Sequence, residues 1–180
     1  MMAFYLQWVK ANPFLSAAVQ FAVLGTLGEI LSISLARRKL GLPGSGFQTL
    51  GKVLAWALLG LIIKGGFIGM RGFTEAIKEH GLLPGILCQG AGYAFILSVF
   101  TNVFFGPQMM LIHRIEDNFI MGEWKFEGIQ KAWWTLLWFW IPAHTVTFMM
   151  EKDLQIGLAA AWSLALGLIL GMSKGGKTGK

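Results

Sequence analysis

The feature that most constrains this chain is a series of long apolar segments, which recur from Phe14 to Met172. The first of them, residues 14–36, contains a single charged side chain. At a helical rise of about 1.5 Å per residue, a segment of this length crosses the ~30 Å hydrocarbon core of a bilayer. Lipid offers the backbone no hydrogen-bond partners, so such segments predict transmembrane helices.

Composition supports this interpretation, because only 13% of the residues are charged and 55% are hydrophobic. Soluble domains carry about 25% charged residues. The lone Cys88 excludes a disulfide scaffold. The sequence therefore predicts an all-α fold, a polytopic transmembrane helical bundle of four to five spans that forms one integral membrane domain over residues 1–180. The expected parts are an interfacial segment at 1–13, spans at about 14–36, 50–72, 83–112, 132–150 and 154–172, a polar loop at 113–131 and a basic tail at 173–180.

The distribution of Lys and Arg predicts an orientation. With five spans, one side receives ten of the fifteen basic residues and the other receives Lys10, Arg71, Lys78 and Lys152, with Lys64 inside a span. Because basic loops stay in the cytoplasm, we expect a cytoplasmic C-terminus and an outer N-terminus. A four-span chain would instead place both ends on one side. No transit-peptide pattern opens the sequence, which favours a bacterial plasma membrane.

Several kinds of chemistry have little support. The segment from Gly171 to Thr178 matches a phosphate-loop pattern, but an apolar helix precedes it where a strand is needed, so nucleotide binding is not expected. His80, His113 and His144 are scattered, which gives no metal-ligand spacing. No nucleophile has an activating partner in view. The net charge of +6 lies beside apolar segments and suits lipid headgroups better than nucleic acid. We expect a protein that is not an enzyme and has no cofactor.

Glu29 is the charged residue inside the first segment, and Lys64 lies inside the second. An ionised carboxylate is costly in hydrocarbon, so Glu29 must be protonated, find a partner or face water. Lys64 is the obvious partner. However, helical rise places Glu29 about 10 Å and Lys64 about 21 Å from the same membrane face, so contact is not assured. Three interpretations stay open for Glu29: a paired or hydrated functional site, a structural hydrogen bond, and a protonated packing residue.

Polar residues and glycines inside the apolar segments supply the remaining candidates. Five polar side chains are candidates to line a polar path through the bundle: Glu29, Lys64, Gln89, Asn102 and His144. Five glycines are candidates for close helix packing, two pairs of them in G-x-x-x-G spacing: Gly28, Gly65, Gly69, Gly167 and Gly171.

Short motifs also stand in a characteristic order along the chain. They are Gly28-Glu29-Ile30-Leu31-Ser32 with Arg37-Arg38 after it, Gly66-Phe67-Ile68-Gly69, Pro84-Gly85, Gln89-Gly90, and Trp140, Pro142, His144 and Phe148. This pattern resembles the Mpv-seventeen and peroxisomal-membrane-protein family of small polytopic proteins. It departs from the family at Met70, where the family has proline, and at Cys88, where it has an acid. Gly106-Pro107 is a competing match to the second-helix motif, outside that order.

The resemblance implies an organellar-type membrane protein of the kind proposed to form weakly selective channels or to support membrane and metabolite homeostasis, without catalysis. Two hypotheses follow. The first is a weakly selective channel or passive conduit for small solutes. The alternative is a structural or interaction protein that packs through its glycine-rich helix faces and transports nothing. The expected partners are the lipid bilayer and, as an open alternative, further copies of the chain.

Overall fold

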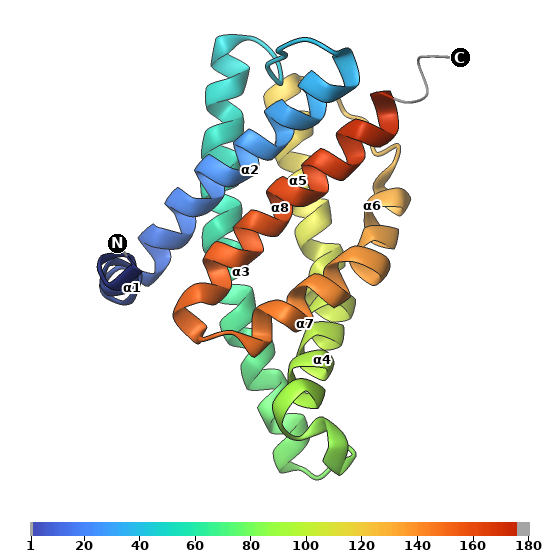
Figure 1. Cartoon of the computed structure of the whole chain (residues 1–180). Coiled ribbons are helices and arrows are strands. Elements are labelled where there is room, and N and C mark those ends of the chain that lie inside the picture. Colours follow the sequence, from blue (N-terminus) through green and yellow to red (C-terminus); the bar gives the residue numbers. More distant parts are fainter. Residues whose placement is uncertain (1, 176–180) are drawn as a thin grey trace.

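The structure, a computed structural model, describes residues 2–175, with side chains up to Met172. Every element in this part of the chain is helical, which confirms the all-α fold (Figure 1). The elements are α1 (Met2–Ala11), α2 (Pro13–Arg37), α3 (Gly46–Glu79), η1 (Gly85–Leu87), α4 (Gly90–Phe100), η2 (Thr101–Phe105), α5 (Gly106–Met121), α6 (Ile129–Thr135), η3 (Leu136–Trp140), α7 (Ile141–Met149) and α8 (Lys152–Gly175).

The helices run back and forth between two ends of the bundle. We call the end with the 38–45 loop the loop end, and the end with the turn at Met150 and Glu151 the turn end. In Figure 1, α2 and α8 run from the turn end to the loop end. The helix that follows α2 along the chain, α3, runs in the opposite direction. Within the described residues, four helical stretches are long and apolar enough to cross a membrane: 13–37, 46–79, 90–121 and 152–172. The chain is a multi-pass integral membrane protein.

The expected fourth span at 132–150 is helical, but it is less clearly a membrane span than the other four. Residues 129–149 do form a continuous helical pass, built from α6, η3 and α7. This pass is not among the four stretches that satisfy length and apolarity. Within the described residues, the chain therefore has four apolar spans and one further helical pass that is rich in tryptophan, which agrees with the expected four to five.

Local sequence explains where α2 and α3 begin and end. Pro13 stands at the first helical position of α2, where its missing N–H is harmless. Arg38 ends the helix in the left-handed region at φ 52°. Ser45 and Gln48 form a reciprocal capping box at the start of α3, with hydrogen bonds of 3.3 and 2.8 Å. Because of this box, α3 starts at Gly46. The expected start of this span was near residue 50.

The predicted boundaries of the third span and of the polar loop are wrong. The helix begins at Gly90, after a 3₁₀ turn, and continues past Pro107 to Met121. A π-helical turn at Thr101–Phe105 precedes the proline, and the Gly106 N–H bonds to the Thr101 carbonyl, five residues back. Because this turn shifts the backbone pairing by one residue, the helix accommodates the proline without ending. The same device, η3, precedes Pro142.

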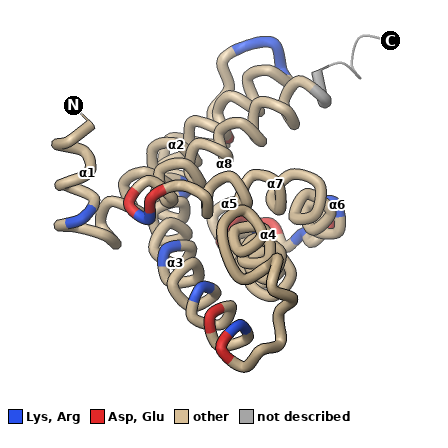
Figure 2. Tube along the Cα trace, turned by 60° about the horizontal axis from the view of Figure 1, so that its bottom comes forward, with Lys and Arg blue, Asp and Glu red and all other residues tan. Residues whose placement is uncertain are grey.

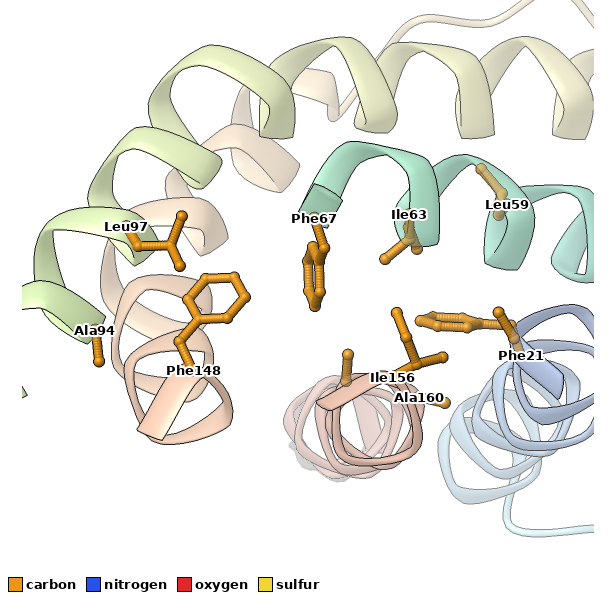
Figure 3. Packing of buried hydrophobic residues seen from close by; sticks show 11 residues of the cluster. Phe21, Leu59, Ile63, Phe67, Ala94, Leu97, Phe148, Ile156 and Ala160 are labelled. Atoms are coloured by element: carbon orange, nitrogen blue, oxygen red, sulfur yellow. The ribbon is translucent and has the colours of Figure 1, made fainter. Parts of the chain in front are cut away.

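Buried apolar side chains connect the helices near the turn end. Figure 3 shows Phe21, Ile63, Phe67 and Ile156 gathered between α2, α3 and α8. Leu97 and Phe148 extend the cluster toward α4 and α7, and the Phe67 and Phe148 rings meet edge to face with centroids 4.9 Å apart. Phe21 and Leu97 are almost fully buried, so this cluster is the apolar core of the bundle.

Glycines bring α2 and α8 into close parallel contact. A Cβ atom added at Gly167 would lie 2.5 Å from the carbonyl oxygen of Gly28, and one at Gly171 would lie 2.8 Å from Cα of Ser32. At Gly28 an added Cβ would meet the backbone of α8 at 3.1 Å. Gly65 and Gly69 differ, since added Cβ atoms there would meet nothing within 4 Å. Thus three of the five predicted packing glycines serve contacts within the chain.

The glycine contacts generate a prediction with an internal control. Gly167→Ala should lower the free energy of unfolding by about 1–3 kcal/mol, because the new methyl group meets backbone that cannot move aside. Gly69→Ala makes the same chemical change in open space and should leave stability unchanged or raise it by up to about 1 kcal/mol through helix propensity. Denaturant titration of both variants in detergent measures the difference. Equal effects would contradict the close contact of α2 and α8.

Candidate functional site

Three charged side chains from three helices form an ion cluster near the loop end. Lys52 of α3 lies between Glu29 of α2 and Asp117 of α5, with its Nζ 2.8 Å from Glu29 Oε1 and 2.6 Å from Asp117 Oδ1. The Lys52 side chain is only 4% exposed, whereas the two carboxylates are 22% and 23% exposed. The partner of Glu29 is therefore Lys52, and Glu29 is a paired residue.

The pairing that the sequence suggested, between Glu29 and Lys64, does not form. Lys64 lies twelve residues beyond Lys52 on α3, or about 18 Å along the helix axis. Glu29 lies eight residues before the end of α2 and Lys52 six residues after the start of α3, at depths of about 12 and 9 Å. Sequence reasoning missed Lys52 because it started the second span at Leu50, which left this lysine at the membrane surface.

Two aromatic rings extend the ion cluster into the bundle. The indole Nε1 of Trp56 donates a hydrogen bond of 3.2 Å to Glu29 Oε2. The Trp56 ring packs against His113 of α5 with ring centroids 4.7 Å apart. His113 Nδ1 lies 4.0 Å from Glu116 Oε2, and within residues 2–172 neither atom has a hydrogen-bond partner although both are buried. Buried polar atoms without a partner in the protein are costly.

A cavity of about 290 Å³ lies between the helices beside this cluster. Its walls are mostly apolar and come from α2, α3, η2, α5, α6, η3, α7 and α8, with Phe21, Phe67 and Trp140 among them. Polar side chains interrupt these walls at several levels: Glu29, Ser32, Thr101, Asn102, His113, Thr135, His144 and Ser163. A partly open, mostly apolar space with a few polar groups is the usual form of a small-ligand site.

Asn102 and His144 mark the other side of the cavity. The Asn102 amide Nδ2 lies 3.1 Å from His144 Nδ1 and 2.8 Å from the Ser98 carbonyl. An amide N–H can only donate, so His144 Nδ1 accepts and the imidazole carries its proton on Nε2. Asn102 is 2% and His144 9% exposed, so the pair is a buried polar group inside an otherwise apolar wall.

The structure brings three of the five predicted polar-path residues together and leaves two apart. Glu29, Asn102 and His144 line the cavity. Lys64 lines a separate hollow between α3 and α8. Gln89 precedes α4 at an exposed position, where its side chain makes no capping hydrogen bond. His113 and Trp56 also line the cavity. Sequence reasoning gave them no role because a histidine in a predicted loop and a single tryptophan in an apolar segment are not distinctive.

The remaining expectations about chemistry concern metals and nucleotides. Within the described residues, no three His, Cys, Asp or Glu side chains are grouped in a way that could hold a metal ion. The segment from Gly171 to Thr178 continues the long helix α8 as far as Gly175. Residues 176–180, which include most of the predicted basic tail and the end of the phosphate-loop pattern, lie outside the described residues.

The ion cluster predicts a large difference between two lysines of the same helix. Lys52→Met removes the cation between two carboxylates and should lower the free energy of unfolding by about 3–5 kcal/mol. Lys64→Met, the matched control, should change it by less than about 1 kcal/mol. Lys52→Met should cost less in a Glu29→Gln background, because fewer unpaired charges remain. Denaturant titration of the four variants in detergent measures these terms, and additivity within about 0.5 kcal/mol would contradict the coupling.

No known protein family, curated protein or solved structure matches the chain. The ion cluster, the cavity and the distribution of charge over the bundle are therefore the basis for inferring what the protein does.

Proposed function

We propose that the protein is a non-enzymatic membrane protein that acts as a weakly selective channel or passive conduit for small solutes. The observation that carries this proposal is the cavity inside the bundle, with Glu29 and His113 toward the loop end and Asn102 and His144 on its other side. Its volume of about 290 Å³ is at the lower limit of ligand pockets, about 300 Å³. A small solute fits this volume better than a lipid or a nucleotide does.

The charges beside the cavity favour cations or neutral polar solutes. The cluster of Glu29, Asp117 and Lys52 carries two negative charges and one positive charge when all three are ionised, which leaves one net negative charge. Both carboxylates are partly exposed, whereas the ammonium group is buried. A fixed negative charge at the wall of a low-dielectric path attracts cations and repels anions.

Glu29→Gln tests the conduit directly. This substitution keeps the size of the side chain and its contact with Trp56, but it removes the net negative charge of the cluster. In planar bilayers or proteoliposomes, the wild-type protein should conduct, and the variant should lose its preference for cations while keeping its fold. Glu79→Gln makes the same change at an exposed position far along α3 and should have no effect.

The same measurement separates the two hypotheses. The absence of flux across many solutes would contradict the conduit and favour a packing role. A specific feature supports that alternative: Gly65, Gly69 and Gly72 form an exposed stripe on α3, where added Cβ atoms would meet nothing within 4 Å. A stripe of this kind allows a second helix to approach closely. In this alternative, the second helix belongs to another copy of the chain, so that the protein forms a homo-oligomer.

Membership of the Mpv-seventeen and peroxisomal-membrane-protein family is likewise a proposal. It rests on the order of the motifs, and one structural feature supports it. The rings of Trp140, His144 and Phe148, which belong to the C-terminal motif, lie in a row with centroids 5.1 and 5.8 Å apart and are tilted by 36° and 34°. These three motif residues, four apart in sequence, therefore share one helix face and contact one another.

For the location we propose a bacterial plasma membrane with the loop end in the cytoplasm. Arg37, Arg38 and Lys39 lie at the loop end, and the positive-inside bias places such residues in the cytoplasm. In a Cys88→Ala background, an impermeant thiol reagent should label Glu151→Cys in intact cells. It should label Leu40→Cys only after permeabilisation. Labelling of both positions in intact cells would contradict this topology, and the reverse pattern would invert the orientation.

A further inference from the structure

A second hollow lies between α3 and α8 at the turn end, separate from the central cavity. Its volume is about 360 Å³, and three of its lining residues are cations: Lys64, Arg71 and Lys152. Glu75 is the one acid in the lining, and it pairs with Lys78 at 3.5 Å. Within residues 2–172, no carboxylate lies within 4.0 Å of the three cationic groups. Counted together with Glu75, the lining carries three positive charges and one negative charge, so the hollow has a net positive charge of two.

Arg71 is held in place by a buried amide. Its Nη2 donates a hydrogen bond of 2.7 Å to Gln155 Oε1, and Gln155 in turn donates from Nε2 to the Met150 carbonyl at 2.9 Å. Gln155 is only 4% exposed. A guanidinium group has five N–H donors, so this bond leaves further donors for a ligand. An anion that binds here meets an arginine that is already ordered.

The hollow lies at the height of the membrane interface. Gly60 of α3 packs against Ala17 of α2, so Lys64, about 6 Å further along the helix, is level with the start of α2 at Pro13. Lys152 is the first residue of α8. The N-terminus of a long helix adds partial positive charge at this point. Figure 2 shows the charged positions along this part of α3, in contrast to the mostly uncharged α2 and α8 above it.

Apolar side chains form the rest of the lining. Phe67 and Ile156 are 5% and 2% exposed and belong to the core, whereas Ile68 is 56% exposed on the outer surface of α3. Further exposed apolar residues, Leu61 and Leu54, continue along α3 toward the middle of the bilayer. A cationic site at headgroup height with an apolar surface beside it matches the two parts of a phospholipid.

We propose that this hollow binds a phosphate group, as carried by the headgroup of an anionic phospholipid or by free phosphate. Arg71 offers several parallel N–H donors to phosphate oxygens. Lys64 and Lys152 each add a charge worth about fivefold in affinity for an anionic headgroup. The proposal does not depend on the conduit, because the hollow does not include Glu29 and shares with the central cavity a single lining residue, Phe67.

The test compares two lipids with identical acyl chains, phosphatidylglycerol and phosphatidylcholine, added to the full-length protein in neutral detergent. Native mass spectrometry should show one retained phosphatidylglycerol, bound at least about fivefold more tightly than phosphatidylcholine. Lys64→Gln and Lys152→Gln should each reduce this preference about fivefold. The control Lys10→Gln removes an exposed lysine at the same end that pairs with Asp153 at 3.4 Å and does not line the hollow, and it should not change the preference. Arg71→Lys keeps the charge but loses the parallel N–H donors of the guanidinium group, so it should weaken binding. This variant tests the role of Arg71 even if Arg71→Gln does not fold.

Competition with inorganic phosphate distinguishes the two sources of the group. If millimolar phosphate displaces phosphatidylglycerol, the hollow is a site for free phosphate; if it does not, the acyl chains contribute and the ligand is a lipid. Equal retention of the two lipids would overturn the proposal. So would an equal loss of preference in Lys10→Gln and Lys64→Gln, because that result would indicate general attraction to a basic surface.

Discussion

The burial of Lys52 between two carboxylates is the interaction on which the arrangement of the helices depends. One ammonium group of α3 joins the preceding helix α2 and the more distant helix α5, at 2.8 and 2.6 Å. A lysine that is 4% exposed in an apolar bundle stays charged only if its partners remain beside it. The cluster therefore fixes the relative depth of three helices, and it places a partly exposed acid at the wall of the cavity.

The cavity follows from how the other helices are shaped around this fixed point. The parallel pair α2 and α8 is drawn together by glycine contacts with backbone atoms as close as 2.5 Å for an added Cβ. Opposite it, both passes that contain an internal proline carry a π-helical turn, η2 and η3. Thr101 and Asn102 from one turn and Leu136 and Trp140 from the other line the cavity. The polar wall thus stands where the helices are locally widened, which is where π turns often mark functional sites.

Sequence alone predicted the fold class because apolar length is a direct measure of what can cross a bilayer. It also singled out Glu29, Asn102 and His144, which line the cavity, since a polar residue inside an apolar segment is conspicuous. The sequence did not predict features that depend on the depth of a residue in the bundle or on local helix geometry. The partner of Glu29 depended on the start of α3, which the capping box of Ser45 and Gln48 determines. The path of the chain beyond Pro107 depended on a π turn, and no residue pattern in that segment predicts one.

The two lysines of α3 show how depth and neighbours decide what an identical group does. Lys52 lies level with acids on two other helices, so its charge is neutralised within the protein and acts in holding the bundle together. Lys64 lies about 18 Å away, at the height where α2 and α8 begin, and it shares its hollow with Arg71 and Lys152. Charge that is balanced internally orders helices; charge that is left unbalanced at the membrane interface is free to attract a ligand from outside. The same helix therefore serves structure at one end and, by our proposal, binding at the other.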